Sequence, residues 1–129
     1  MSGMLAQFAA VGVGSALGAW LRWGLSAWLN PRNPVWPSGT IAANLIGGYV
    51  VGFAIAYFAA RPGIPPEWRL FAITGVLGGL TTFSTFSAEV TQLLLRGDWL
   101  PGMGLAAVHL GGSIVLTIAG IATFRLLAA

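Results

Sequence analysis

The charged residues of this chain are spaced so that four long uncharged segments lie between them. These segments are residues 1–21, 33–60, 70–88 and 99–124, and they contain 21, 28, 19 and 26 residues. A helix needs about 20 residues to cross a hydrocarbon core of about 30 Å, and a chain in lipid must satisfy its own backbone hydrogen bonds. The spacing therefore predicts an all-α membrane protein with four transmembrane helices.

The composition excludes most other classes of protein. Of the 129 residues, 57% are hydrophobic and only 7% are charged, whereas soluble domains are about 25% charged. Six arginines and three acidic residues give a net charge of +3, which is too sparse for a nucleic-acid-binding surface. With no cysteine and a single histidine, an enzyme is not expected. We expect one four-helix transmembrane domain, residues 1–129, surrounded by membrane lipid.

The arginines are divided almost equally between the two predicted sides of the membrane. If the amino terminus is cytoplasmic, three lie on that side and two or three on the other: Arg61, Arg69 and Arg125 against Arg32, Arg96 and, near the interface, Arg22. Orientation follows the imbalance of arginine and lysine in short loops, so a near-tie predicts insertion in both orientations. Alternatively, one loop arginine or the first helix decides the orientation.

The third uncharged segment contains the residues that least favour a regular helix. Gly78 and Gly79 each lower helix propensity by about 1 kcal/mol, and the hydroxyl groups of residues 81–85 can bond to nearby backbone. We expect a break near mid-membrane, where irregular backbone must be buried or line a cavity and freed carbonyls can bind a cation. The alternative is a continuous helix whose hydroxyls bond to the carbonyl four residues earlier.

Two phenylalanines follow this expected break. Phe83 and Phe86 are three residues apart and share one face of a helix. The edge of an aromatic ring carries the positive part of its quadrupole, so an edge that faces a dry passage can favour an anion without an ionised group. Ordinary aromatic packing is the alternative explanation for both side chains.

Uncharged polar residues also occur in the second and fourth segments. Asn44 offers an amide, while His109, Ser113 and Thr117 recur every four residues and so lie along one stripe of a helix. A stripe of neutral donors suits an anion path. Interhelical hydrogen bonds, or a histidine that only packs, would also account for these residues.

Four short helices leave no room for a lined aqueous path, so a transport protein of this size must form an oligomer. Pairs of glycines four residues apart permit close helix approach, within one chain or between chains; they are Gly14–Gly18, Gly48–Gly52 and Gly75–Gly79. Many transporters contain an inverted repeat. An antiparallel homodimer would supply one.

The sequence resembles the small fluoride channels of the Fluc or CrcB family over essentially its whole length. The resemblance is carried by GSALGAWLRW at 14–23, GTIAANLIGG at 39–48 and, above all, GGLTTFSTFSAE at 78–89. It implies a dual-topology antiparallel homodimer in the bacterial inner membrane, which exports fluoride passively and electrogenically through two separate pores. It also implies a structural Na⁺ at the two-fold axis, held by main-chain carbonyls of Gly78 and Thr81 from both subunits.

The same resemblance implies a set of residues along the anion pathway. By motif position they are the aromatic box residues Phe83 and Phe86, the pore amide Asn44, the polar track His109, Ser113 and Thr117, the vestibule arginine Arg22 and the pore-associated Glu89, with Ser84 and Thr40 near the path. Ser84 and Thr40 could equally be structural. A vestibule arginine would concentrate anions, and neutral donors would bind fluoride without trapping it.

Two other functions remain open from the residues alone. A proton-coupled exporter of the small multidrug type is also a dual-topology dimer of four-helix chains, but it needs a carboxylate that faces a central cavity. Glu89 is the candidate, and it lies near the end of its segment. A structural subunit of a membrane complex would explain the glycine pairs but not the hydroxyl-rich third segment.

Overall fold

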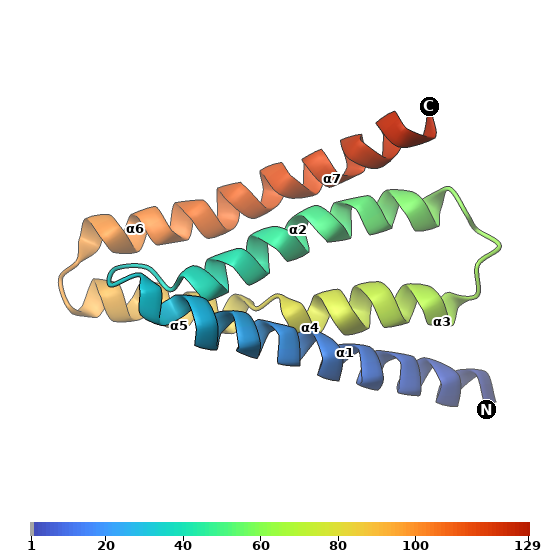
Figure 1. Cartoon of the computed structure of the whole chain (residues 1–129), viewed down its shortest axis with the longest axis horizontal. Helices are drawn as coiled ribbons and strands as arrows, with labels where there is room; N and C mark the ends of the chain where they lie inside the picture. Colours follow the sequence, from blue (N-terminus) through green and yellow to red (C-terminus); the bar gives the residue numbers. More distant parts are fainter. Residues whose placement is uncertain (1) are drawn as a thin grey trace.

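The computed structural model describes residues 2–129 and contains four long apolar helical spans. The spans are Gly3–Arg32, Ser38–Ala59, Pro66–Leu95 and Trp99–Ala128, and each is long and apolar enough to cross a membrane. Figure 1 shows them running alongside one another, with both termini and the loop between the second and third spans at the same end. The predicted all-helical protein with four membrane spans is confirmed.

The first two spans are each a single α-helix, whereas the third and fourth are built from several helical pieces. The first is α1 (Ser2–Leu29) with a 3-10 turn, η1 (Asn30–Arg32), and the second is α2 (Ser38–Ala59). The third contains α3 (Pro66–Arg69), the π-helical η2 (Leu70–Leu77), α4 (Gly78–Leu80) and α5 (Phe83–Leu95). The fourth contains α6 (Trp99–Ala107), the π-helical η3 (Val108–Gly112) and α7 (Ser113–Ala128).

Local sequence explains where several of these helices begin and end. Pro66 occupies the first position of α3, where its missing N–H removes no helical hydrogen bond. Gly97 follows α5 with a φ of +84°, a left-handed conformation that glycine adopts without steric cost. The side-chain oxygen of Asn30 accepts a 2.7 Å hydrogen bond from the N–H of Gly39, which satisfies a donor in the first turn of α2.

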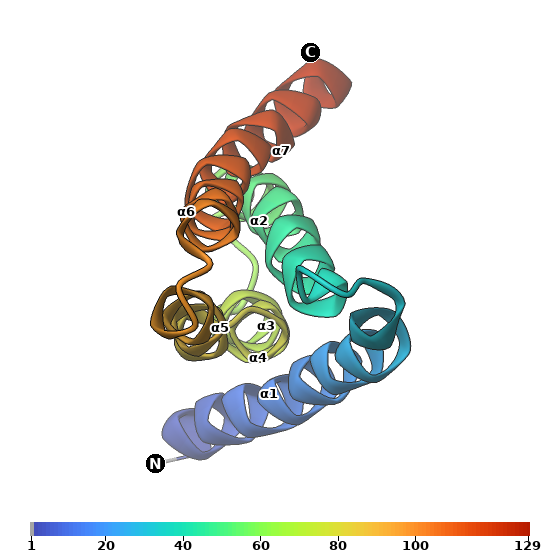
Figure 2. The same cartoon turned by 90° about the vertical axis from the view of Figure 1, so that its left-hand side faces the viewer.

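Close backbone contacts hold the four spans together. In Figure 2, α1 and α7 lie on opposite sides of the bundle, with α2 and the third span between them. A side chain on Gly14 would lie 2.9 Å from the Cα of Gly75, and one on Gly52 would lie 2.8 Å from the carbonyl carbon of Thr117. The glycine pairs of the sequence therefore allow close contacts between helices of one chain. α1 contacts η2 and α4 in this way, and α2 contacts α7.

Between α4 and α5, two residues of the third span have extended rather than helical backbone. Thr81 has φ −94° and ψ 153°, and Thr82 has φ −150° and ψ 121°. The short non-helical segment that connects α4 to α5 is visible in Figure 1. Gly78 and Gly79, the weakest helix formers nearby, are themselves helical. The extended backbone lies beside α2, where it contributes to the groove described below.

Candidate functional site

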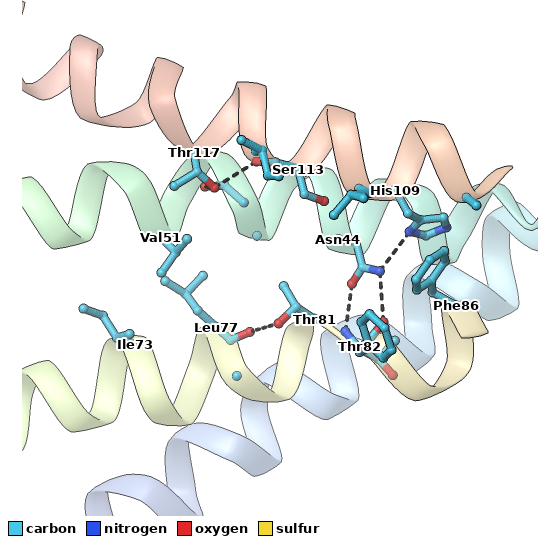
Figure 3. A pocket seen from close by; sticks show the side chains of 17 residues that line it. Asn44, Val51, Ile73, Leu77, Thr81, Thr82, Phe86, His109, Ser113 and Thr117 are labelled. Carbon is cyan, nitrogen blue, oxygen red and sulfur yellow. Dashed lines mark hydrogen bonds between the residues drawn. The ribbon is translucent and has the colours of Figure 1, made fainter. Parts of the chain in front are cut away.

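An open groove of about 560 Å³ lies between α2, the third span and the fourth span. Figure 3 shows the side chains that line it. Its polar lining residues are Asn44, Thr81, Thr82, His109, Ser113 and Thr117, and the rest of the lining consists of glycine, aliphatic side chains, Phe83 and Phe86. Among residues 2–129, no charged side chain lines this groove. The site is therefore one in which uncharged groups alone can contact a solute.

Asn44 connects the extended backbone of the third span to the fourth span. Its side-chain oxygen accepts a 2.8 Å hydrogen bond from the N–H of Thr82, and its Nδ2 donates to the Thr82 carbonyl at 3.0 Å. The same Nδ2 lies 3.0 Å from Nδ1 of His109 (Figure 3). Both Asn44 and His109 are buried, at 9% and 3% exposure. Three segments far apart in the sequence thus meet at one amide.

The two phenylalanines lie beside this amide but differ in their surroundings. The ring of Phe86 lies against the imidazole of His109, with centroids 4.6 Å apart and planes inclined by 36°. Phe83 meets Phe86 edge-on at 5.2 Å and is 77% exposed. Phe86 is thus half-buried and packed against His109, whereas most of the Phe83 ring is free to contact something outside the chain.

Hydroxyl groups continue the polar lining along the fourth span. The Thr117 hydroxyl lies 2.9 Å from the carbonyls of both Gly48 and Ser113 and donates to them. Ser113 lines the groove between His109 and Thr117, and its hydroxyl makes no hydrogen bond within residues 2–129. The predicted track of three polar residues is therefore brought to one surface, with a free hydroxyl at its centre.

The interruption leaves carbonyl groups of the third span without their usual helical partners, among them those of Gly78 and Thr81. Thr82 N–H would bond to the Gly78 carbonyl in a continuous helix, but it donates to Asn44. Thr85 N–H would bond to the Thr81 carbonyl, but it donates to the Thr82 hydroxyl at 3.1 Å. Gly78 and Thr81 both line the groove. Backbone oxygens freed in this way are suitable ligands for a cation.

Four residues expected near the pathway lie outside the lining of the groove. Arg22 donates from Nε to the Gly79 carbonyl at 3.1 Å, which connects α1 to α4. One oxygen of Glu89 accepts a 2.8 Å hydrogen bond from the Thr40 hydroxyl, and the other is buried without a partner within residues 2–129. Ser84 is exposed, with its hydroxyl 3.4 Å from that of Thr82.

Thr82 is the residue of this site that sequence reasoning missed. Its backbone N–H and carbonyl both bond to Asn44, and its hydroxyl caps α5 by accepting from Thr85. The signal in the sequence was a hydroxyl residue just after the glycine pair and just before the phenylalanines, the pattern of a helix N-cap. The backbone contacts themselves could not be inferred from that pattern.

Comparisons with known proteins match most of the chain. A family model described as CrcB-like protein, Camphor Resistance (CrcB), matches residues 9–121. A protein named Fluoride-specific ion channel FluC from Thiobacillus denitrificans is 58% identical over 123 residues, which are 95% of this chain and 99% of that protein. Proteins of the same name from Cupriavidus necator and Ralstonia nicotianae are 60% identical over 122 residues and 58% identical over 127. These alignments cover 94% and 98% of this chain, and 96% and 99% of the relatives.

Proposed function

Because this chain belongs to the CrcB-like protein family, a family of ion channels and not of enzymes, we propose that it is a fluoride channel. It is a multi-pass membrane protein of the bacterial inner membrane. In this proposal fluoride leaves the cytoplasm by passive, electrogenic flux, which lowers its intracellular concentration. The relatives that cover nearly the whole chain, and carry the name of fluoride-specific channels, support this assignment.

The observation that carries the proposal is the uncharged polar groove. Fluoride is small and strongly hydrated, so a pathway through lipid must replace its water with hydrogen-bond donors. A fixed cation deep in the path would bind the ion too firmly for release, whereas conduction needs entry without trapping. The groove offers the imidazole of His109, the free hydroxyl of Ser113 and the ring edges of Phe83 and Phe86. Thr117 lines the same path, but its hydroxyl hydrogen is already donated to main-chain carbonyls. These groups can hold an anion weakly at successive positions.

A second copy of the chain would close the groove. The groove is open on one side, and Phe83 at its edge is 77% exposed. An antiparallel partner would place a second, equivalent groove on the other side of a two-fold axis, giving two pores. The near-even division of arginines between the ends of the bundle supports insertion in both orientations. By the bounds of the spans, Arg61, Arg69 and Arg125 belong to one end, and Arg32 and Arg96 to the other.

The freed carbonyls of Gly78 and Thr81 fit the sodium ion that the family resemblance implies. Neither carbonyl accepts the N–H that would bond to it in a continuous helix, and both residues line the open groove. Two copies would present four carbonyl oxygens, which are ligands of the kind hard cations prefer. When bound, sodium would compensate the facing carbonyl dipoles of the two interruptions. The hydrogen bond from Arg22 to Gly79 holds the adjacent carbonyl back against α1.

The polar residues outside the groove have supporting roles in this proposal. Arg22 raises the local concentration of anions, because its positive charge acts over several ångströms in a low-dielectric setting. Glu89, one helical turn after Phe86 on α5, pairs with Thr40 on α2, and we place this pair where an ion would leave the groove. Ser84 lies between the two phenylalanines on α5, with its hydroxyl near that of Thr82. The proton-coupled exporter is disfavoured because Glu89 does not line the groove, whereas a proton carrier must face the cavity.

Flux measurements on purified protein in liposomes test the proposal. We expect fluoride uptake that depends on the membrane potential and is far faster than chloride uptake. The changes Phe83→Ile and Phe86→Ile should reduce flux because they remove ring edges while preserving apolar volume. Phe53→Ile is the matched control, since Phe53 meets Phe124 edge-on at 5.5 Å in the contact of α2 with α7, away from the groove lining. Unchanged flux in both groove variants would remove the rings from the mechanism.

A further inference from the structure

The contacts of Asn44 give its amide a role other than direct contact with an ion. We propose that Asn44 is a positioning residue that holds His109 in the tautomer with its hydrogen on Nε2, and that this N–H is the donor offered to fluoride. The inference rests on the proposed function and identifies one donor within that pathway. It follows from three hydrogen bonds and one buried atom that lacks a partner.

The backbone of Thr82 fixes the orientation of the Asn44 amide. The side-chain oxygen faces the Thr82 N–H at 2.8 Å, and the side-chain nitrogen faces the Thr82 carbonyl at 3.0 Å. A flipped amide would place two donors against each other at one contact and two acceptors at the other. Because a backbone N–H and carbonyl cannot exchange roles, only one orientation of the side chain is compatible with this site.

The oriented amide in turn determines the tautomer of His109. One hydrogen of Asn44 Nδ2 is used by the Thr82 carbonyl, and the second is directed at His109 Nδ1, 3.0 Å away. Nδ1 must therefore accept, so the neutral imidazole carries its hydrogen on Nε2. Both hydrogens of the Asn44 amide are occupied in this arrangement. The amide has none left for an anion.

The His109 Nε2 atom is buried and has no hydrogen-bond partner within residues 2–129. His109 is only 3% exposed, and the Phe86 ring lies against its imidazole. A buried donor left unpaired costs free energy, so an acceptor that reaches it gains a strong interaction. A small anion that has shed its water is such an acceptor. Ser113, one helical turn along the groove, provides a free hydroxyl as the neighbouring position.

Histidine NMR can test the inference directly, because the chain contains a single histidine. Native protein with ¹⁵N-labelled histidine should show Nε2 protonated and Nδ1 as a hydrogen-bonded acceptor. Added fluoride should shift the Nε2 resonance in a saturable way, and equal chloride should not. A hydrogen on Nδ1, or fluoride-induced shifts at the Asn44 side-chain amide with Nε2 unmoved, would overturn the inference.

Substitutions extend the test to transport. Asn44→Asp places an oxygen against His109 Nδ1, so the imidazole hydrogen should move from Nε2 to Nδ1. The fluoride-induced shift of the Nε2 resonance should then vanish. Fluoride flux should fall at least about ten-fold, as expected for loss of a hydrogen bond to a charged ligand. His109→Gln keeps an N–H donor and should retain more flux than His109→Phe. Tyr49→Phe is the control: it removes a half-buried hydrogen bond from α2 to Thr123, outside the groove lining, and should leave the tautomer and the flux unchanged.

These measurements separate this inference from the proposed function. The tautomer is measured without any transport, so native protein with the Nε2 hydrogen but no fluoride flux would overturn the proposed function instead. Fluoride-selective flux together with an unchanged tautomer and a normal fluoride-induced shift in Asn44→Asp would overturn the positioning role alone. If Asn44→Asp does not fold, the fluoride titration of the native protein still decides the matter.

Discussion

The same substitution, glycine to alanine, should change stability in opposite directions at two helical positions of this protein. A Cβ on Gly120 of α7 would lie 2.8 Å from the backbone nitrogen of Phe53 and would also collide with the Tyr49 carbonyl. At Gly24 of α1, nothing lies within 4 Å of the added atom. The backbone of α2 cannot yield at Gly120 as the end of a flexible side chain could. It can only move away from α7.

The expected size of each effect follows from these surroundings. Alanine is a better helix former than glycine by up to about 1 kcal/mol, so Gly24→Ala should be neutral or stabilising by that amount. At Gly120 the same gain is opposed by overpacking, which costs about 1–3 kcal/mol where neighbours cannot relax, so a net loss of up to about 2 kcal/mol is expected. The free energy of unfolding should therefore differ by about 2 kcal/mol between the variants.

Denaturant unfolding in mild detergent, followed by tryptophan fluorescence, provides the assay, since the chain has six tryptophans. Gly12→Ala is a second control, because an added Cβ there also meets nothing within 4 Å. If Gly120→Ala were as stable as Gly24→Ala, the direct backbone contact of α2 with α7 would be wrong. The width of the groove between these helices would then have to be reconsidered as well.

Three further results are expected. Asn44→Ala should destabilise the protein about three times as much as Tyr49→Phe in the same unfolding assay, because it removes three hydrogen bonds rather than one. Each such bond is worth about 0.6 kcal/mol on average in membrane proteins. Equal losses of unfolding free energy would refute the hydrogen bonds of Asn44 with Thr82 and His109. Gly63→Cys, in the exposed loop after α2, should be labelled by impermeant thiol reagents from both faces of the membrane, and labelling from one face alone would exclude dual topology. Thr82→Ala removes the hydroxyl that accepts from the Thr85 N–H, so this N–H should bond to the Thr81 carbonyl instead. That carbonyl would then bind sodium less well, and half-maximal fluoride flux should require more sodium. An unchanged sodium dependence would argue against the proposed sodium site at the Gly78 and Thr81 carbonyls.

The third span illustrates how far sequence reasoning reaches. The glycine pair at 78–79 and the hydroxyl residues after it indicate a weak helix, yet α4 retains helical geometry at both glycines and the extended residues are Thr81 and Thr82. Intrinsic propensity identifies the weak segment. Contacts with other helices decide which residues leave the helix, since Asn44 takes the backbone groups of Thr82.

Sequence spacing likewise predicted the positions of some polar residues but not the partners of others. The four-residue spacing places His109, Ser113 and Thr117 on one stripe, and all three line the groove. Spacing did not reveal that Arg22 binds the Gly79 carbonyl or that Glu89 pairs with Thr40. Those partners are 57 and 49 residues apart, so no local pattern relates them.

The sequence by itself determined the four membrane spans, because the distance between charges is a local property that can be compared directly with the thickness of a lipid bilayer. It also determined the family, because the motifs that carry the resemblance are short stretches of consecutive residues that can be recognised without a structure. Only the tertiary structure decided that Asn44 meets both Thr82 and His109, across 38 and 65 residues. That meeting depends on how closely the helix backbones approach at their glycines, and this approach is set by packing between spans rather than by the residues of any one of them.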